Sequence, residues 1–209
     1  DRLGVRPLYY TWVGQIFIFA SEIKSILASG FISAEFSFEG IDQVYSVWSN
    51  IFPTTPFKNI SELPPSHYML VTPQGVSIKR YWEIPWGQYA NLKEDEYLEG
   101  VSHHLEKSVK LRLRADVPVA AYLSGGLDSA LTTTLAKKWT NSSLKTFSLE
   151  FSDPRFDESI YQREMVKYLQ TNHSSIRCTE KDIIEYIDDV IWATERPLLR
   201  TAPIPMFLL

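Results

Sequence analysis

Cysteine is almost absent from this sequence of 209 residues, in which Cys178 is the only one. A single thiol excludes an internal disulfide framework and a zinc site built from several cysteines. The residues around it, 174–178, have the pattern of a short strand. We therefore interpret Cys178 as an unreactive thiol in the core.

An excess of positive charge is also missing, because 21 lysines and arginines stand against 25 aspartates and glutamates, a formal net charge of -4. Surfaces for nucleic acid or anionic membranes need clustered basic side chains, so we expect neither as the main partner. No segment approaches the roughly 18 consecutive apolar residues of a membrane-spanning helix. The chain also starts, at Asp1, without an initiator methionine or a signal peptide, and we expect the natural N-terminus to lie upstream.

What is present is a globular composition, with 44% hydrophobic and 22% charged residues. At roughly 100 to 200 residues per domain, the length allows one large domain or two small ones. The composition changes near residues 84–88, which resemble a linker. We therefore expect one domain over residues 1–88 and another over residues 89–209.

The first part has the pattern of strands and turns. Apolar segments 8–12 and 15–19 flank Gly14 and predict a hairpin, and segments 68–71 and 76–82 predict a second hairpin around a Pro-Gln-Gly turn. Two helices are expected between these hairpins.

The first of these helices covers residues 22–27, with Ser21 as its N-terminal cap and Gly30 at its end. The second is predicted from apolar residues spaced as one helical face, which are Ile41, Val44, Tyr45 and Trp48. Both helices interrupt a segment that is otherwise rich in strand-forming residues.

The second part is predicted to open with a long amphipathic helix that begins near Glu94. An apolar residue recurs every four positions along it, at Tyr97, Val101, Leu105, Val109 and Leu113. His103 and His104 also belong to this helix, but neighbouring positions do not share a helical face. We interpret them as surface histidines rather than as a metal-binding pair.

After Pro118, strands and helices alternate. Strands are predicted over residues 119–123, 145–151 and 174–178, and helices over residues 129–138 and 159–169. Thr179 and Asp182 have the spacing of a capping box that opens a further helix. This alternation predicts an α/β fold with a parallel, doubly wound sheet.

The residues with the clearest chemical meaning are Leu123, Ser124, Gly125, Gly126, Leu127, Asp128 and Ser129, between an apolar strand and a helix. Adjacent glycines let the backbone approach a ligand, and free amides at a helix start favour an anion. We expect these amides to converge on one phosphate group. The loop lacks the terminal lysine of a Walker A motif. Asp128 could ligate Mg²⁺ or cap the helix, and Ser129 could also be the cap.

This loop resembles that of the ATP pyrophosphatase superfamily, which holds the pyrophosphate released when ATP is cleaved between its α and β phosphates. Extended over residues 112–129, the sequence is similar to the glutamine-hydrolysing asparagine synthetases. Residues 1–10 and 19–25 resemble the later part of the class II glutaminase domain in that family. Residues 63–68 resemble its Pro-Pro-Gly-His turn, with Ser66 in place of glycine, and residues 156–159 match a further family segment.

The resemblance implies a fold and a ligand. Residues 1–88 would be part of an antiparallel-sheet, glutaminase-like domain of the Ntn type. Residues 89–209 would be part of a doubly wound, parallel-sheet ATP pyrophosphatase domain of the HUP-like type. The loop would bind ATP and pyrophosphate, with backbone groups of Leu123 and Leu149 holding the adenine and Asp128 contacting Mg²⁺. ATP and Mg²⁺ are thus the expected cofactors.

The sequence departs from the family at two positions. Glu150 stands where the family commonly has glycine, so that the charge near the nucleotide would change unless this side chain points to solvent. Arg200 stands where the family has an acidic residue, and could be a scaffold charge or a substrate contact. These departures leave the identity of the acceptor carboxylate open.

Two features of the family are absent from these residues. The glutaminase nucleophile is an N-terminal cysteine, and Cys178 is internal. The second nucleotide loop, of the form Ser-Gly-Glu-Gly-x-Asp-Glu, would follow Leu209. We therefore expect an internal fragment that is inactive alone, and assign no catalytic residue within it.

The resemblance implies an ATP-dependent amidotransferase that makes asparagine from aspartate and glutamine-derived ammonia through a β-aspartyl-adenylate, releasing AMP and pyrophosphate. One alternative is a relative that closes a β-lactam ring or amidates another carboxylate. Another is a nucleotide-binding module without chemistry. ATP use and the lack of a disulfide framework favour the cytoplasm, and a homodimer is left open.

Overall fold

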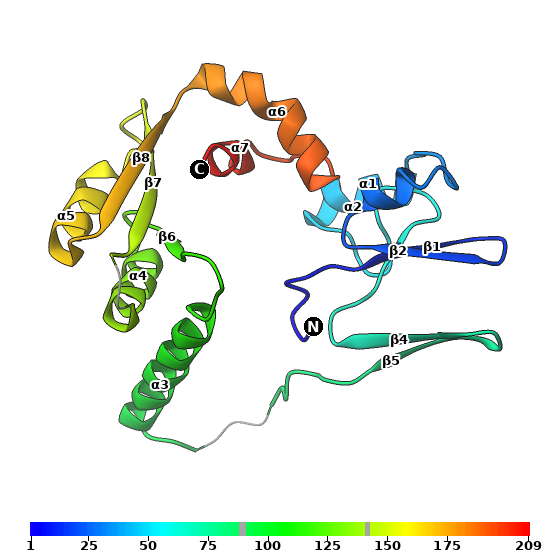
Figure 1. Cartoon of the computed structure of the whole chain (residues 1–209), viewed down its shortest axis with the longest axis horizontal. Helices are drawn as coiled ribbons and strands as arrows, with labels where there is room; N and C mark the ends of the chain where they lie inside the picture. The colour runs from blue at the N-terminus through cyan, green and yellow to red at the C-terminus, as the bar shows by residue number, and fades with distance from the viewer. Residues whose placement is uncertain (88–90, 141–142) are drawn as a thin grey trace. The chain divides into compact units, whose positions relative to one another are not determined.

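The computed structural model describes residues 1–87, 91–140 and 143–209 and is shown in Figure 1. It contains two compact units, Asp1–Gln88 with Asp188–Arg200, and Tyr89–Ile187 with Thr201–Leu209. The structure thus groups residues 188–200 with the first unit, whereas the sequence predicts them in the second domain. The domain boundaries of the natural protein stay a prediction.

The first unit is built on antiparallel strands. Strands β1 and β2 form one hairpin and β3 pairs with β1, while β4 and β5 form a separate hairpin. The bounds are β1 Tyr9–Val13, β2 Ile16–Ala20, β3 Ser61–Glu62, β4 His67–Thr72 and β5 Gly75–Arg80. Both predicted hairpins are confirmed, and Gly14 makes the first turn with φ of 60°.

Two helices complete this unit, α1 (Ile23–Leu27) and α2 (Phe38–Val47). The core lies where α1 meets β1 and consists of Tyr9, Ile23, Ile26 and Ile60. On α2, Val44 is buried, whereas Tyr45 is 62% exposed, so the predicted apolar face is only partly covered. Trp48 lies outside α2, at its C-cap in the left-handed region.

The predicted cap of α1 is wrong. Glu22, and not Ser21, occupies the N-cap position, and its side chain makes no capping hydrogen bond. Instead, the carboxylate of Glu195 accepts hydrogen bonds from the backbone amides of Ile23 and Lys24. A carboxylate at these amides satisfies donors that have no partner inside the helix and interacts favourably with the helix dipole. Because Glu195 is more than 170 positions away in sequence, local pattern could not reveal it.

The second unit contains three parallel strands in the order β6-β7-β8. The elements in chain order are α3 Glu94–Arg112, β6 Ala120–Tyr122, α4 Leu127–Trp139, β7 Lys145–Phe151, α5 Ser159–Leu169, β8 Asn172–Cys178, α6 Glu180–Thr194 and α7 Pro203–Phe207. The predicted alternation and parallel pairing are confirmed. Helices α4 and α5 contact each other beside the sheet (Figure 1), as expected for two crossovers of the same hand.

These strands are added in one direction only, without the reversal of strand order that defines a doubly wound sheet. That part of the predicted fold stays untested by the described residues. The predicted capping box is present, because the Asp182 carboxylate accepts from the Thr179 amide at 2.7 Å and the Thr179 hydroxyl accepts from the Asp182 amide at 3.4 Å. Cys178 is buried, as expected, and burial raises the pKa of its thiol.

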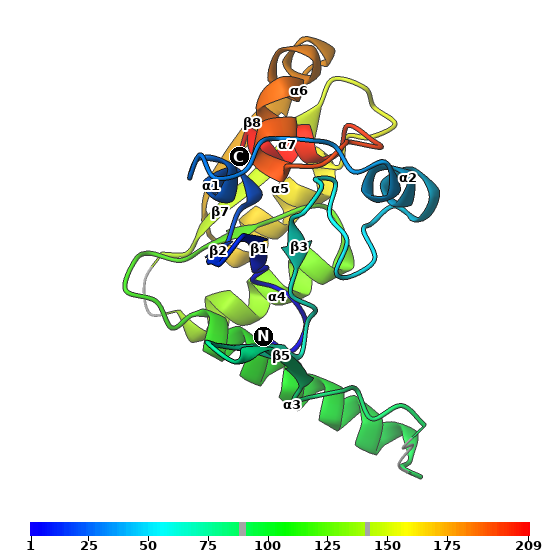
Figure 2. The same ribbon diagram turned by 90° about the vertical axis from the view of Figure 1, so that its right-hand side faces the viewer.

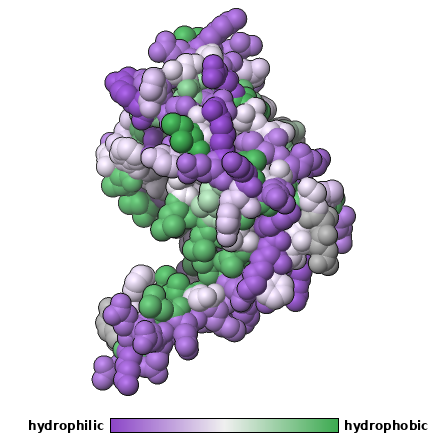
Figure 3. Space-filling model, turned by 90° about the vertical axis from the view of Figure 1, so that its left-hand side faces the viewer, coloured by the Kyte–Doolittle hydropathy of each residue, from purple (hydrophilic) through white to green (hydrophobic). Residues whose placement is uncertain are grey.

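The long helix α3, which is labelled in Figure 2, is less buried than its pattern predicts. None of its residues is buried, and Val101 on the apolar stripe is 65% exposed. Its link to α4 is instead polar and aromatic, since Glu106 pairs with Lys138 and accepts from the indole of Trp139, and Lys110 lies over the Trp139 ring. Exposed apolar side chains form patches on the molecular surface, visible in Figure 3.

His103 and His104 are both exposed on α3, as expected, although their rings contact each other edge to face at 5.5 Å. The described part of the chain holds no cluster of three or more histidine, cysteine or acidic side chains that could bind a metal. None of the helices in the described ranges combines the length and apolarity needed to cross a membrane.

Candidate functional site

The candidate loop follows directly from strand β6, as the sequence predicts. Leu123 continues the sheet, because its amide donates to the carbonyl of Phe147 at 2.8 Å. The hydroxyl of Ser148 on β7 donates to the Leu123 carbonyl. With its side chain only 1% exposed, Leu123 fixes the start of the loop against the sheet.

Two serine hydroxyls close the loop on itself. The Ser124 amide donates to the Ser129 hydroxyl at 3.1 Å, and the two hydroxyls are 2.8 Å apart. The Gly126 amide donates to the Ser124 hydroxyl at 3.1 Å. The Ser129 hydroxyl also lies 3.0 Å from the Gly126 carbonyl. Both serines are therefore bonded within the turn, which they hold in a strand-to-helix conformation.

Asp128 does not cap helix α4, so that of its two predicted roles, helix capping and Mg²⁺ ligation, only ligation is left. Gly126 is the N-cap, so Asp128 is the second residue of the helix rather than its cap. Asp128 is exposed, and its carboxylate makes no hydrogen bond or ion pair within the described ranges. The interpretation of Asp128 or Ser129 as the cap is wrong. The Asp128 carboxylate instead remains available for a ligand.

The amide of Gly125 has a partner that sequence analysis missed. It donates to the carboxylate of Glu158, at the start of α5, at 2.8 Å. A Cβ atom on Gly125 would lie 2.7 Å from the Cβ of Glu158, so only glycine allows this close approach. The amides of Ser124, Gly125 and Gly126 therefore bind hydroxyls and a carboxylate of the chain in this structure, and the convergence of the loop amides on one phosphate group stays a prediction. The sequence marks residues 156–159 as a family segment but gives no sign of their contact with the loop.

A small cavity of about 140 Å³ lies beside the loop and is lined by both residues expected to hold adenine. Leu123 and Leu149 line it together with Ser124 and Glu158. This is less than the roughly 300 to 1,000 Å³ of a pocket that encloses a whole drug-sized ligand. The cavity is therefore suited to one edge of a ligand whose remainder lies along the open loop.

Gln162 is a second lining residue that sequence analysis missed. Its side chain is buried, with the residue 3% exposed, and its Nε2 donates to the carbonyl of Leu149 at 2.9 Å. Because that carbonyl requires a donor, the amide orientation is fixed, and the buried Oε1 has no hydrogen-bond partner among the residues that the structure describes. No pattern in the sequence distinguishes Gln162 from an ordinary residue of α5.

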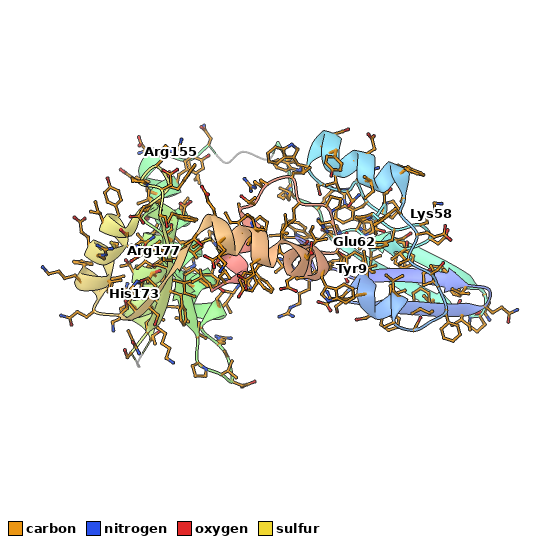
Figure 4. All side chains as sticks on the ribbon, turned by 90° about the horizontal axis from the view of Figure 1, so that it is seen from above. Tyr9, Lys58, Glu62, Arg155, His173 and Arg177 are labelled. Carbon is orange, nitrogen blue, oxygen red and sulfur yellow. The ribbon has the colours of Figure 1, made fainter. Side chains whose placement is uncertain are left out.

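The two departures from the family pattern have local partners. The Glu150 carboxylate is 3.4 Å from Arg163 and 3.7 Å from Arg177, so its charge is compensated within the second unit. Figure 4 labels Arg177 on β8. In the first unit, the guanidinium of Arg200 lies over the ring of Trp48 at 5.8 Å.

The carboxylate of Asp157, the residue before Glu158, is bound by local hydrogen bonds. The Ser159 hydroxyl donates to Asp157 at 2.8 Å, and this hydrogen bond lowers the pKa of Asp157. The amide of Phe151 donates to the same carboxylate at 3.4 Å. Asp157 thus connects the end of β7 to the start of α5 and positions Glu158 next to the loop.

The first unit contains a larger, mostly apolar cavity of about 480 Å³, between α1, α2 and residues 191–197. None of the predicted site residues lines it. Nearby, Tyr9 and Glu62 are paired across β1 and β3 and lie close together in Figure 4. Burial is the main cause that raises the pKa of both groups, and the positive charge of Arg196 opposes it.

The fold and the loop define an α/β protein with a glycine-rich turn between a parallel strand and a helix. Residues 100–209, more than half of the chain, match the family model described as asparagine synthase. Residues 1–82 match a glutamine amidotransferase domain. The chain belongs to the asparagine synthase family. The resemblance inferred from the sequence is thereby confirmed.

Curated relatives carry the same family name. The chain is 31% identical to asparagine synthetase 3 (glutamine-hydrolyzing) of Bacillus subtilis, over 94% of the chain and 34% of the relative. It is 34% identical to a putative asparagine synthetase 2 of Methanocaldococcus jannaschii, over 94% of the chain and 39% of the relative. It is also 32% identical to the amidase chyE of Penicillium rubens, over 95% of the chain and 32% of that protein. The chain thus spans about a third to two fifths of the length of these relatives.

Proposed function

We propose that this chain forms the ATP-binding loop region, and part of the glutamine amidotransferase domain, of an enzyme that makes asparagine from aspartate with glutamine-derived ammonia. The observation that carries the proposal is the loop of residues 123–129, which joins a parallel strand to α4 within the region that matches the asparagine synthase model. The names of the bacterial and archaeal relatives support the same reaction.

In the proposed reaction, a carboxylate oxygen of aspartate attacks the α phosphorus of ATP, and the bond from that phosphorus to the pyrophosphate leaving group breaks. Ammonia then attacks the β-aspartyl-adenylate and releases AMP. The role of this chain is to bind and orient ATP. Backbone groups at Leu123 and Leu149 would contact the adenine, and the amides of Gly125 and Gly126, at the N-terminus of α4, would hold pyrophosphate oxygens.

A magnesium ion fits this site only as a companion of ATP. The described residues contain no group of three acidic or other metal ligands, but Asp128 presents an unpaired carboxylate at the loop. Mg²⁺ in nucleotide sites commonly uses one or two carboxylates together with substrate phosphates and water. Asp128 would be that carboxylate, and the ion would neutralise the charge of the phosphates.

A related amide-forming enzyme with another acceptor is the second candidate, because two of the relatives are named amidases and not asparagine synthetases. Both candidates use the same loop and differ in the acceptor carboxylate. The compensated charge of Glu150 also argues that this departure does not disturb the nucleotide site. We further propose a cytoplasmic location, because the reaction consumes ATP.

The proposal is tested by aspartate-dependent exchange of pyrophosphate into ATP, measured with the full-length gene product. We expect Asp128→Ala to lower the exchange rate at least tenfold and to leave glutamine hydrolysis unchanged. The matched control is Asp116→Ala, which removes an exposed carboxylate that precedes β6. Exchange that survives in Asp128→Ala would remove Asp128 from the site, and exchange that requires another acceptor acid would favour the second candidate.

A further inference from the structure

One of the loop amides proposed to hold a phosphate oxygen, that of Gly125, already binds a carboxylate of the same chain. Glu158 accepts from the Gly125 amide at 2.8 Å. Glu158 also lines the cavity that contains Leu123, Ser124 and Leu149. The carboxylate therefore lies within the proposed nucleotide site, although no role in that site has yet been assigned to it.

We infer that Glu158 competes with the nucleotide phosphates for the Gly125 amide and so sets the affinity of the loop for anions. This inference rests on the proposed function of the loop. One amide hydrogen cannot serve two acceptors with good geometry, and two anions at the same donor repel each other. A phosphate oxygen that binds Gly125 must therefore displace the Glu158 side chain.

The contacts of Glu158 make such a displacement feasible. The hydrogen bond to Gly125 is its only side-chain hydrogen bond or ion pair within the described ranges, and the residue is exposed. Its backbone, in contrast, is fixed, because its carbonyl accepts from the Gln162 amide at the start of α5. The side chain can thus turn towards solvent while the helix and the loop keep their positions.

The same geometry explains why the competitor is a long acidic side chain on α5. The Cβ of Glu158 would be 2.7 Å from a Cβ at position 125, so glycine is required there for the helix to approach. At this distance between the backbones, the carboxylate of a glutamate at position 158 reaches the Gly125 amide without any movement of the backbone. The neighbouring Asp157 is held by Ser159 and Phe151 and is not free to take this role.

An alternative role for Glu158 is ligation of Mg²⁺ together with Asp128. The two roles predict changes of opposite sign. If Glu158 competes with phosphate, removing its carboxylate tightens the binding of a phosphate anion. If it ligates the ion, removing it weakens the binding of the magnesium complex of that anion.

The test is calorimetric titration of the 209-residue chain with inorganic pyrophosphate, with and without Mg²⁺, for the wild type, Glu158→Ala and Glu158→Gln. Glu164→Ala is the matched control, because it removes an exposed glutamate of the same helix. We expect Glu158→Ala to bind pyrophosphate about 2 to 12 times more tightly, the equivalent of one net hydrogen bond. Glu158→Gln keeps an acceptor without charge and should fall between Glu158→Ala and the wild type.

Amide spectra of each variant establish that it is folded, and the Gly125 resonance should shift in Glu158→Ala even without ligand. Equal or weaker pyrophosphate binding by Glu158→Ala, while the wild type binds, overturns the role of Glu158 and leaves the loop assignment intact. Absence of binding in every variant at millimolar pyrophosphate overturns the loop assignment as well. The two failures are therefore distinguishable.

Discussion

Two glutamates in this chain bind backbone amides that are far away in sequence, and they do so in different surroundings. In the first unit, Glu195 accepts from the amides of Ile23 and Lys24 and also pairs with the Lys24 ammonium at 3.4 Å. Its side chain is only 10% exposed. In the second unit, Glu158 accepts from one amide, is exposed and has no paired cation within the described ranges.

This difference shows which of the two carboxylates a ligand can replace at its backbone amide. A buried carboxylate with two amide donors and a cation is costly to remove, because its donors would be left without partners. An exposed carboxylate with one donor is readily replaced, since water can satisfy the amide. Glu195 is therefore a fixed part of the first unit, and Glu158 occupies a position that a phosphate can take.

The largest effect is expected for Glu195→Ala. Because the amide of buried Ile23 and that of Lys24 lose their acceptor, the first unit should lose about 2–3 kcal/mol of unfolding free energy. Denaturant unfolding and hydrogen exchange at these two amides measure it. Glu22→Ala is the control, since it removes only a partly exposed partner of Lys24 and should cost less than about 1 kcal/mol. Equal losses in both variants would contradict the comparison.

A smaller effect is expected where the second unit depends on close approach. Gly125→Ala places a Cβ against the Cβ atoms of Glu158 and Tyr161, and should cost about 1–3 kcal/mol through overpacking. Gly126→Ala is the matched variant, because its Cβ would meet only the Ser124 hydroxyl, at 3.3 Å. Gly125→Ala should therefore have a lower melting temperature than Gly126→Ala. Identical melting temperatures would show that α5 moves away from the loop without loss of stability.

The cap of α6 is formed by residues close in sequence, and its stability can be compared with that of the distant cap of α1 by Glu195. Thr179→Ala removes the hydroxyl that accepts from the Asp182 amide and should cost about 1 kcal/mol. Thr179→Ser keeps the hydroxyl and should recover most of the loss. If Thr179→Ala costs more than Glu195→Ala, the distant carboxylate is not the stronger cap.

The smallest effect is a pH dependence in the second unit. Burial lowers the pKa of His173, which Figure 4 labels on β8. The ring Nδ1 of His173 lies 3.0 Å from the Thr146 hydroxyl. Its folded pKa lies below the unfolded value near 6.5, so the unfolded chain binds the proton more readily. Stability should be fully present above that pH and fall as the pH decreases below it. His173→Gln should flatten this dependence in urea titrations, and an unchanged slope would remove His173 as its source.

Local pattern predicted the elements of both units but not the contacts between distant segments. The bounds of β7 and α5 agree with the predicted ranges, because strand alternation and helical spacing are encoded within each segment. The caps of α1 and the partner of Gly125 were missed, because Glu195 and Glu158 reach them through the tertiary fold. The covered face of α3 was overestimated, because amphipathic spacing does not reveal how much of a stripe is packed.

In the candidate site, the loop and its flanking strand and helix could be predicted, because two glycines between an apolar strand and a helix form a local signal. The hydrogen-bond partners within the loop could not be predicted, because several amides and carbonyls lie within reach of each serine hydroxyl. Gln162 was also missed, because its contact with the Leu149 carbonyl depends on how α5 packs on β7.

The central claim, that the loop of residues 123–129 binds nucleotide phosphates, is tested most directly by following backbone amide resonances of the chain during titration with MgATP. The account predicts that the Gly125 and Gly126 amides shift most and saturate together, with smaller shifts at Leu123 and Leu149. Saturable binding that leaves the Gly125 and Gly126 amides unchanged would contradict it.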